Sequence, residues 1–431
     1  MATRILCVLN RLPYPVIGGR EKMICQALDF MCRTDSEIHL VVFEPEHHWK
    51  SLPDRFNALK KRYGKIERIT TLGMPNRLYC LVNIFFRTFV FGRKSLQESL
   101  FYSFQANYRL AKITRAIKPD VIYCDSARTA QFFEYSKTKA RKVFDADDLL
   151  SKRYRIMEMG SQINLLGSFV DKMPRTYKWL GSGIISRALV RLEARLMFRR
   201  ENTLARVFNH VILVSPVEGA ELQDRIKEAN VHYIYPTTRT VLLDRPELQN
   251  GESPVISFMG LLNIPHNQIG LQGFLENIFP KIIRQVPNVR FQIIGSNAPK
   301  KIIQLASRFR DNVVFAGFVE NFADALKTTR VFVAPIYFGT GIKTKIIDAM
   351  ALGLPVVTTP IGAEGLSIQN RENIMIAEDD NQFADCVVEL LKDSSLNKHI
   401  SEQARLYIQE HHNPDKEAQR FWEILGLRRD D

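Results

Sequence analysis

Short runs of β-branched and other apolar residues recur along the whole chain, and longer segments with helical spacing separate them. Runs that are apolar at every position are typical of parallel strands buried on both faces of a sheet. The runs fall into two series, 5–9, 38–43, 121–123, 142–144 and 211–214, then 255–258, 289–294, 313–315, 331–333 and 355–358. Two series of strands alternating with helices predict an α/β chain of two doubly wound, Rossmann-like domains.

A polar stretch with Pro236, Pro246 and Gly251 separates the two series and predicts the domain boundary. The end of the chain is predicted to be a helix with Phe421 and Trp422 on one side, which we expect to cross back onto the first domain. The predicted parts are a first domain at 1–240 with a helical insertion at about 150–205, a second domain at 241–412 and a terminal helix at 413–431.

The cysteines and the apolar stretches exclude several classes of protein. Six cysteines are scattered, with no CxxC pair and no histidines at metal-ligand spacing. This argues against a zinc site or a disulfide framework and for a reducing compartment. The apolar stretch 78–91 is interrupted by Asn83 and Arg87, so it falls short of the ~20 apolar residues of a membrane span. The run at 5–9 is too short for a signal peptide, so we expect a cytoplasmic protein.

Positive charge is concentrated in the first half of the chain. The net charge is +14, with 36 Lys and Arg against 18 Asp and Glu in residues 1–200, and 24 against 28 in residues 201–431. Such asymmetry indicates an anionic partner for the first half, which could be membrane lipid, a phosphate-bearing substrate or nucleic acid. The alternative is a basic surface that only keeps the protein soluble.

Two segments of the first domain follow predicted strands and carry residues suited to a ligand. Gly18 and Gly19 precede an apolar helix, where adjacent glycines admit a close ligand and the helix N-terminus favours an anion. This signal is weak alone, because Gly-Gly pairs are common in turns and the pattern is not GxGxxG. Asp145, Asp147 and Asp148 follow another strand and could orient a hydroxyl nucleophile or hold a divalent metal. Helix capping would explain one of these acids but not three.

The segment 335–366 of the second domain is the most informative. A strand ends at its start, and Gly339-Thr340-Gly341 is predicted to open a helix that carries Lys343 and Lys345 in its first turns. Lysines there oppose the helix dipole, so a purely structural helix would not favour them. Glycine amides, the dipole and two ammonium groups together suit a pyrophosphate. Asp348, further along the helix, could accept hydrogen bonds from a ribose.

This segment resembles the donor-site motif of retaining GT-B glycosyltransferases of the glycosyl transferases group 1 type. An acid at Asp348 precedes Ala-Met-Ala-x-Gly-x-Pro-Val-Val at 349–357, and the segments 258–267, 287–295 and 314–319 match in order and spacing. The resemblance extends over essentially the whole chain and is strongest from 255 to 366.

Two motifs of the first domain resemble the bacterial polysaccharide-assembly branch of that family, namely Pro-Tyr-Pro-x-x-Gly-Gly at 13–19 and Asp-x-Asp-Asp-x-x-Ser at 145–151. The resemblance implies two domains facing each other across a cleft, with the acceptor bound in the first and a nucleoside-diphosphate sugar in the second. The donor-binding residues are then predicted to be Gly18, Gly19, Gly260, Asn263, Asn267, Gly339, Thr340, Gly341, Asp348 and Glu364. The acceptor-loop residues are predicted to be Asp125, Arg128, Asp145 and Asp148.

The chain departs from the family pattern at several positions. The first acid of the family's pair falls on Thr340, and the usual Arg and Lys after the first strand of the second domain fall on Leu261 and His266. The histidine that many relatives carry in the first domain falls on Asp147. Two lysines of the glycine-rich segment would then compensate as phosphate ligands, and we predict Asp147, Lys343 and Lys345 as catalytic.

Two stretches of the first half mix basic and apolar side chains. Residues 77–94 combine phenylalanines with arginines and a lysine, and Arg187, Arg191, Arg195 and Arg199 recur every fourth residue beside leucines. Both are typical of a helix on anionic lipid, although an ordinary helix with its apolar face in the core fits equally well. The predicted membrane-surface residues are Phe85, Phe86, Arg87, Phe89, Arg93 and Lys94. Nucleic acid is discounted, because no stacking motif or nucleic-acid fold accompanies them.

These observations predict a glycosyltransferase that moves a sugar from a nucleoside-diphosphate sugar to a glycan acceptor, lipid-linked and at the inner face of the membrane. The resemblance implies retention at the anomeric carbon and a role in cell-surface polysaccharide synthesis, and we expect neither a cofactor nor a metal. Two alternatives stay open, a nucleotide-sugar epimerase on the same fold and a non-catalytic carbohydrate- or membrane-binding scaffold. Replacement of an acid by Thr340 suggests the second.

Overall fold

The computed structural model describes residues 2–14, 16, 18–44, 52–159, 184–241, 243, 252–319 and 321–430. The described residues divide into two compact units, the first made of those up to 159, of 184–235 and of 415–430, and the second of those from 236 to 414. The division after Tyr235 lies within the polar stretch that separates the two predicted series of strands, and the end of the chain belongs to the first unit. Part of the predicted helical insertion, 160–183, lies outside the described residues.

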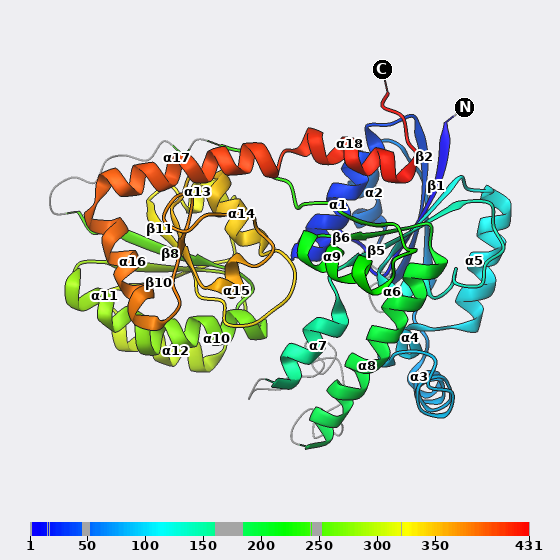
Figure 1. Cartoon of the computed structure of the whole chain (residues 1–431), viewed down its shortest axis with the longest axis horizontal. Helices are drawn as coiled ribbons and strands as arrows, with labels where there is room; N and C mark the ends of the chain where they lie inside the picture. The colour runs from blue at the N-terminus through cyan, green and yellow to red at the C-terminus, as the bar shows by residue number, and fades with distance from the viewer. Residues whose placement is uncertain are drawn as a thin grey trace. The chain divides into compact units, whose positions relative to one another are not determined.

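The first unit is built on a seven-stranded parallel sheet with the order β3-β2-β1-β4-β5-β6-β7 (Figure 1). The strands are β1 (Thr3–Leu9), β2 (Ser36–Glu44), β3 (Ile66–Gly73), β4 (Val121–Asp125), β5 (Arg141–Asp147), β6 (His210–Leu213) and β7 (Val231–Tyr233). All five predicted runs of the first series are strands. β3 and β7 were not predicted, because these edge strands carry exposed or half-buried side chains and lack a continuous apolar run.

Helices cover both faces of this sheet, as the alternating side chains of β1 show. Ile5, Cys7 and Leu9 pack into one core, and Leu6 and Val8 into the other. The first core is covered by α1 (Gly19–Cys32), α2 (Leu52–Arg62) and α18 (Pro414–Leu425). The second is covered by α5 (Phe104–Ile117), α6 (Ser126–Ala130), α8 (Ile184–Val207) and α9 (Pro216–Arg225). The remaining helices of this unit are α3 (Arg77–Asn83), the π-helical segment η2 (Ile84–Val90), α4 (Leu96–Phe101) and α7 (Leu150–Met159).

The second unit is built on a six-stranded parallel sheet with the order β10-β9-β8-β11-β12-β13. Its strands are β8 (Val255–Met259), β9 (Arg290–Ile294), β10 (Val313–Gly317), β11 (Thr329–Ala334), β12 (Val356–Thr358) and β13 (Met375–Ile376). The helical elements are α10 (Pro265–Gly273), η5 (Phe274–Ile278), α11 (Phe279–Gln285), α12 (Lys300–Ala306), η6 (Ser307–Phe309), α13 (Phe322–Ala325), α14 (Thr344–Ala351), α15 (Pro360–Ala363), α16 (Asp380–Lys392) and α17 (Ser394–His411). The predicted second series is confirmed, and only the two-residue β13 was not predicted.

Each sheet has one point at which the strand order reverses. In the first sheet this point lies between β1 and β4, and in the second between β8 and β11. Loops that leave the carboxyl ends of parallel strands diverge there and leave a crevice, which is where open α/β sheets bind ligands. The two predicted ligand segments of the first unit and the glycine-rich segment of the second follow strands at or beside these points.

Among the helices that the structure describes, none combines the length and the apolar composition that a membrane crossing requires.

Candidate functional site

In the second unit, the loops after β8 and β9 meet by close backbone contact. A Cβ atom on Gly295 would lie 1.9 Å from the carbonyl oxygen of Gly260, and a Cβ on Gly260 would lie 2.7 Å from Nδ2 of Asn267. Glycine is therefore required at both positions. Asn267 is buried and donates from Nδ2 to the carbonyl oxygen of Leu261 at 2.8 Å, which fixes its side-chain oxygen toward the loop after β11.

The glycine-rich loop after β11 differs in detail from the prediction. α14 begins at Thr344, so Gly339 and Gly341 precede the helix rather than open it, and Lys343 occupies the N-cap position. Both glycines have positive φ, +133° and +65°, which explains why glycine stands there. Nζ of Lys343 donates to carbonyl oxygens of its own loop, at 3.2 Å to Thr340 and 2.6 Å to Gly341. A bound anion would have to draw this ammonium away from the loop.

Lys345 joins the two sides of the reversal point. It lies in the first turn of α14, donates from Nζ to Oδ1 of Asn267, and its ammonium is 4.4 Å from the ring centroid of Phe258. Burial, and to a smaller extent the charge of Lys343, lowers the pKa of Lys345 to about 7. Among the described residues, this poorly solvated ammonium contacts an amide oxygen and an aromatic ring rather than a carboxylate, so it would gain from a bound phosphate.

The other predicted donor residues have different environments. Thr340 is buried, Asp348 and Glu364 are half-buried, and Asn263 is exposed. Glu364 follows α15 directly after β12, the neighbour of β11. Thus the carboxyl ends of β8, β11 and β12 supply all the predicted donor residues except two. Gly18 and Gly19 belong to the first unit, where Gly18 is the N-cap of α1.

In the first unit, the loops after β1 and β4 are tied together at the reversal point. The backbone N–H of Asn10 donates to Asp125 Oδ2 at 3.2 Å, and its side-chain amide donates to Ser126 Oγ at 3.0 Å. Ser126 has a φ of +69°, a conformation that a serine rarely adopts. Strained residues of this kind persist where the surrounding contacts hold them, and they cluster at functional sites.

Arg20, which the sequence analysis did not single out, lies at the centre of this edge. Its Nε donates to Asp125 at 2.8 Å, and its NH1 is 3.2 Å from Asp145 and 3.1 Å from Asp147. Tyr123 donates its hydroxyl to the other oxygen of Asp145. The sequence could have revealed Arg20, because it follows the Gly-Gly pair in the first turn of a helix. A cation at this position opposes the helix dipole, as Lys345 does in the second unit.

Asp147 is the carboxylate of this cluster that reaches the solvent. Its side chain is 25% exposed, against 0% for Asp125 and 9% for Asp145. Its φ is +67°, so it also adopts the left-handed conformation. Burial raises the pKa of Asp147 to about 6, with Arg20 opposing the rise and the neighbouring aspartates adding to it.

Two predicted acceptor-loop residues have other partners. Asp148 is buried and pairs with Arg153 of α7. Arg128 donates from Nε to Oε1 of Gln97 at 2.9 Å, and burial lowers its pKa. The structure therefore brings Asp125, Asp145 and Asp147 together around Arg20 and gives Asp148 and Arg128 separate contacts.

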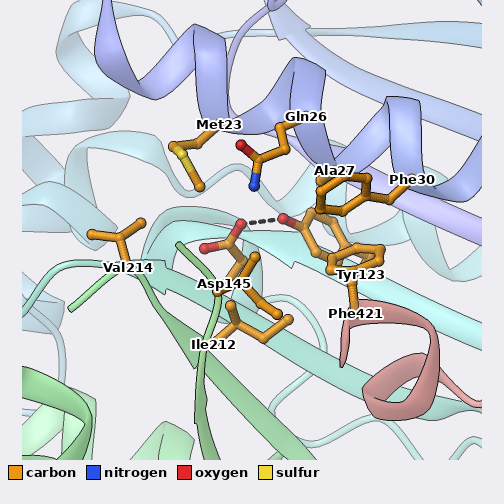
Figure 2. Close-up of a pocket in the computed structure, with 10 residues that line it drawn as sticks. Met23, Gln26, Ala27, Phe30, Tyr123, Asp145, Ile212, Val214 and Phe421 are labelled. Atoms are coloured by element: carbon orange, nitrogen blue, oxygen red, sulfur yellow. Dashed lines mark hydrogen bonds between the residues drawn. The ribbon is translucent and has the colours of Figure 1, made fainter. Parts of the chain in front are cut away.

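A small cavity lies behind Asp145 in the first unit (Figure 2). Its volume of about 10 Å³ is near the lower limit for one water molecule and far too small for a sugar. In Figure 2, Met23 and Phe30 of α1, Tyr123 of β4 and Phe421 of α18 point into it, and the hydrogen bond from Tyr123 to Asp145 crosses one side. This cavity is therefore not a binding place for a sugar substrate.

The predicted membrane-surface residues divide into exposed and inward-facing ones. Phe85, Phe86 and Phe89 are 57%, 47% and 54% exposed, and Arg93 is exposed as well. The prediction for the other two is wrong. Lys94 is buried beside Glu134 and Glu98, and it pairs with Glu134, which balances the charge of these buried carboxylates together with Arg200. The guanidinium of Arg87 faces inward, 3.7 Å from the ring centroid of Tyr102, and donates to Gln131 at 3.0 Å.

The helix formed by α3 and η2 has its polar side chains inward. Asn83 donates to the carbonyl oxygen of Tyr102 at 2.8 Å, and the buried Thr88 lies 2.8 Å from Oγ of Ser99. Its exposed side chains are almost all apolar, namely Leu78, Tyr79, Leu81, Val82, Phe85, Phe86, Phe89 and Val90, with Phe91 directly after them. α8 is the opposite case. The four arginines that recur every fourth residue, Arg187, Arg191, Arg195 and Arg199, are exposed, but Leu196 and Met197 are buried in the core, so α8 is an ordinary helix with its apolar face inward.

Comparison with known proteins shows the family of the chain. The family model described as glycosyl transferases group 1 matches residues 253–393. A Klebsiella pneumoniae protein described as an uncharacterized 44.6 kDa protein in the cps region is 30% identical over 422 residues, which cover 96% of this chain and 97% of that protein.

Solved structures with the same fold cover nearly the whole chain. Sucrose-phosphate synthase from Thermosynechococcus elongatus has a TM-score of 0.63 at 14% identity and covers 98% of both chains. HepE from Anabaena, solved with UDP and glucose, has a TM-score of 0.66 at 15% identity over 98% of this chain and 99% of that chain. TarM has a TM-score of 0.66 at 14% identity over 99% of both chains. The chain belongs to the glycosyl transferases group 1 family and has the GT-B fold.

Proposed function

We propose that this glycosyltransferase moves a sugar from a nucleoside-diphosphate sugar to a lipid-linked glycan acceptor during cell-surface polysaccharide synthesis. The observation that carries the donor half is the contact between Lys345 and Asn267, which joins the first turns of α14 and α10, the helices that follow β11 and β8 at the reversal point. Two ammonium groups and the amides at the start of α14 would stabilise the leaving diphosphate, which is the main charge that develops in such a transfer.

The relatives support the substrate classes. HepE was solved with UDP-glucose, and Staphylococcus aureus TarM with UDP and α-GlcNAc-glycerol. The relative from the cps region of Klebsiella pneumoniae supports a role in polysaccharide synthesis. Retention at the anomeric carbon rests on the family resemblance alone, and the anomeric coupling constant of the product tests it.

Thermal unfolding with a panel of nucleoside-diphosphate sugars tests the donor. We expect one base and one sugar to raise the Tm most, because a ligand that binds only the folded chain stabilises it by mass action. Incubation of that donor with and without a lipid-linked glycan then separates the activities. A transferase forms its product only with the acceptor, whereas an epimerase changes the donor without it. Stabilisation by no nucleotide sugar would contradict the proposal.

We propose further that the helix formed by α3 and η2 rests on the inner face of the cell membrane. Its apolar side chains point outward while its polar ones are satisfied inside, which is the reverse of an ordinary surface helix. Phe104 and Tyr108 of α5 are 67% and 63% exposed, and the backbone N–H of Phe104 donates to the hydroxyl of Tyr79 at 3.4 Å, so α5 extends the same surface.

The charge around this apolar surface fits anionic lipid. Glu98 is the one acidic residue in the sequence from 74 to 118, and it is buried and paired with Arg200. The exposed cations of that stretch are Arg77, Arg93, Arg109, Lys112, Arg115 and Lys118. Each cation near an anionic leaflet contributes roughly 1 kcal/mol, and inserted phenylalanines add binding that salt does not screen.

Flotation with vesicles tests this surface. We expect binding to vesicles that contain anionic lipid, weakened by salt and by Arg77→Glu with Arg93→Glu, and lost on Phe85→Ser with Phe89→Ser. Phe318→Ser is a matched control, because Phe318 is 72% exposed but belongs to the second unit. Equal binding to neutral and anionic vesicles, or to neither, would contradict the proposal. The basic first half of the chain would then bind a soluble anionic acceptor instead.

A further inference from the structure

The edge of the first sheet holds an arginine that touches three carboxylates. Arg20 reaches Asp125 through Nε and NH2, and Asp145 and Asp147 through NH1. NH2 also lies 3.4 Å from the backbone oxygen of Asp145. The guanidinium has five N–H donors, and these contacts direct all of its nitrogens to the aspartates.

The three carboxylates differ in what else holds them. Asp125 accepts from the backbone of Asn10 and is fully buried, and Asp145 accepts from Tyr123 and from the backbone N–H of Asp147. Asp147 has a partly exposed side chain, and its backbone is held in the left-handed conformation. Asp125 and Asp145 therefore anchor the guanidinium, and Asp147 presents a carboxylate to the solvent at the crevice where open α/β sheets bind ligands.

We propose that Arg20 is a positioning residue for Asp147, aiming its carboxylate at the acceptor hydroxyl and keeping it ionised; this inference rests on the proposed function. A carboxylate in that place accepts a hydrogen bond from the hydroxyl that attacks the donor sugar, and only its ionised form can accept through both oxygens. The single guanidinium thus supplies both the direction and the charge state of the group.

The charged groups around Asp147 come from three elements. Arg20 of α1 and Arg153 of α7 favour its ionised form, and Asp145 of β5 and Asp148 of the following loop oppose it. Arg153 already pairs with Asp148, so Arg20 is the cation that compensates the remaining carboxylates. Loss of Arg20 should raise the pKa of Asp147, since an opposite charge at such a distance shifts an aspartate by roughly one to three units.

Arg20→Met and Arg20→Lys test the assignment, with Arg206→Met as control, because Arg206 forms a single exposed ion pair with Glu228. In the proposed transfer reaction, the acidic limb of the kcat/KM profile should move to higher pH by about one unit or more in Arg20→Met, and by less in Arg20→Lys. Arg206→Met should leave the limb in place. A uniform loss of rate with an unchanged limb in both Arg20 variants would overturn the proposal and leave Arg20 a structural residue.

A second readout needs no activity. The native pKa of Asp147 lies above its unfolded value, so the stability of the wild type relative to Asp147→Asn falls as pH rises toward about 6 and then levels off. Denaturant unfolding with and without Asp147→Asn, in the wild-type, Arg20→Lys and Arg20→Met backgrounds, gives the pH at which this stability difference levels off. We expect that pH to be higher in the Arg20→Met background than in the wild type, and an unchanged pH would overturn the proposal. If it moves but no acceptor is ever glycosylated, the proposed function fails while the pairing of Arg20 with Asp147 stands.

Discussion

The ammonium of Lys345 lies between the ring of Phe258 and the amide oxygen of Asn267, and its lowered pKa of about 7 reflects the poor solvation of that place. A bound diphosphate would raise this pKa, because it supplies the opposite charge that the site lacks. We therefore expect nucleotide binding above pH 7 to take up a proton and to weaken as pH rises.

Calorimetry in buffers of different protonation enthalpy measures that uptake. It should approach one proton at about pH 8 in the wild type and vanish in Lys345→Met, whose side chain keeps the contact with Phe258 but has no charge. Lys398→Met, a change at an exposed lysine of α17, is the control. The transition-state stabilisation calculated from kcat/KM should be lower in Lys345→Met by on the order of 2–4 kcal/mol. Undiminished proton uptake in Lys345→Met would assign the proton to another group.

Asp147→Asn should separate the two substrates of the proposed reaction. Asparagine tolerates the left-handed conformation that Asp147 adopts, so the loop should keep its shape. We expect the affinity for nucleotide to stay unchanged and transfer to fall by roughly 10²-fold or more, the range for a lost acid or base group. Calorimetry measures the nucleotide affinity, and a transfer assay measures the rate. A collapse of nucleotide affinity would instead move Asp147 to the donor site or to a structural role.

The sequence could predict only part of the candidate site. Lys343 and Lys345 were found because cations at the start of a helix are unfavourable unless they bind an anion. Asp147 was found because acids at the carboxyl end of a buried strand lie where α/β sheets bind ligands. The contact of Lys345 with Asn267 joins residues 78 positions apart, and no local pattern encodes it. Arg20 was missed because its partners lie at the ends of two other strands, β4 and β5, so its role depends on the order of strands in the sheet.

At the scale of single elements, all ten predicted strands exist, because a strand buried on both faces must be apolar at nearly every position. The edge strands β3 and β7 escape this requirement and lack a continuous apolar run, and β13 has only two residues, so these three were not predicted. The edge strand β10 was found because its residues 313–315 are apolar although half-buried or exposed. The helix formed by α3 and η2 was recognised as amphipathic, but the side that faces outward could not be read from its period. That choice depends on the buried polar partners supplied by Tyr102 and Ser99.

Arg93 and Lys94 are neighbours just before α4 with opposite surroundings, so they form a matched pair for mutation. Lys94 pairs with Glu134, which Arg200 also binds at 2.7 Å, whereas Arg93 is exposed. Lys94→Glu places a third carboxylate beside Glu98 and Glu134 and should cost roughly 3–5 kcal/mol of unfolding free energy. Arg93→Glu should change stability by less than about 0.5 kcal/mol. Equal denaturant midpoints for the two variants would contradict the buried ion cluster.

At the scale of the whole molecule, the last helix belongs to the unit that begins the chain. α18 follows α17 of the second unit directly, yet Phe421 packs in the core with Ile5 and Ile24, and the indole of Trp422 donates to the carbonyl oxygen of Phe30 at 2.8 Å. The fold of the first unit therefore needs residues from both ends of the chain. Such a contact cannot form until the second unit has been synthesised, and the apolar stripe of α18 gives no sign of which unit it covers.

Phe421→Ala tests this division of the molecule. The ring lies 5.6 Å from that of Phe30 and 6.1 Å from that of Tyr123, and its removal from a buried core should cost the first unit about 3–5 kcal/mol. Eight of the ten predicted donor residues, Lys345 and its partner Asn267 lie in the second unit, so the nucleotide should still stabilise that unit in the variant. Hydrogen exchange resolved by segment can follow the two units separately. Protection should fall in β1 and β4 of Phe421→Ala and stay constant in β8 and β11, where added nucleotide should still raise it.

Leu406→Ala, at a half-exposed position of α17, should leave both patterns unchanged. If Phe421→Ala lowered protection equally in both sheets, the two units would unfold as one, and α18 would stabilise the chain as a whole rather than the unit whose core it completes.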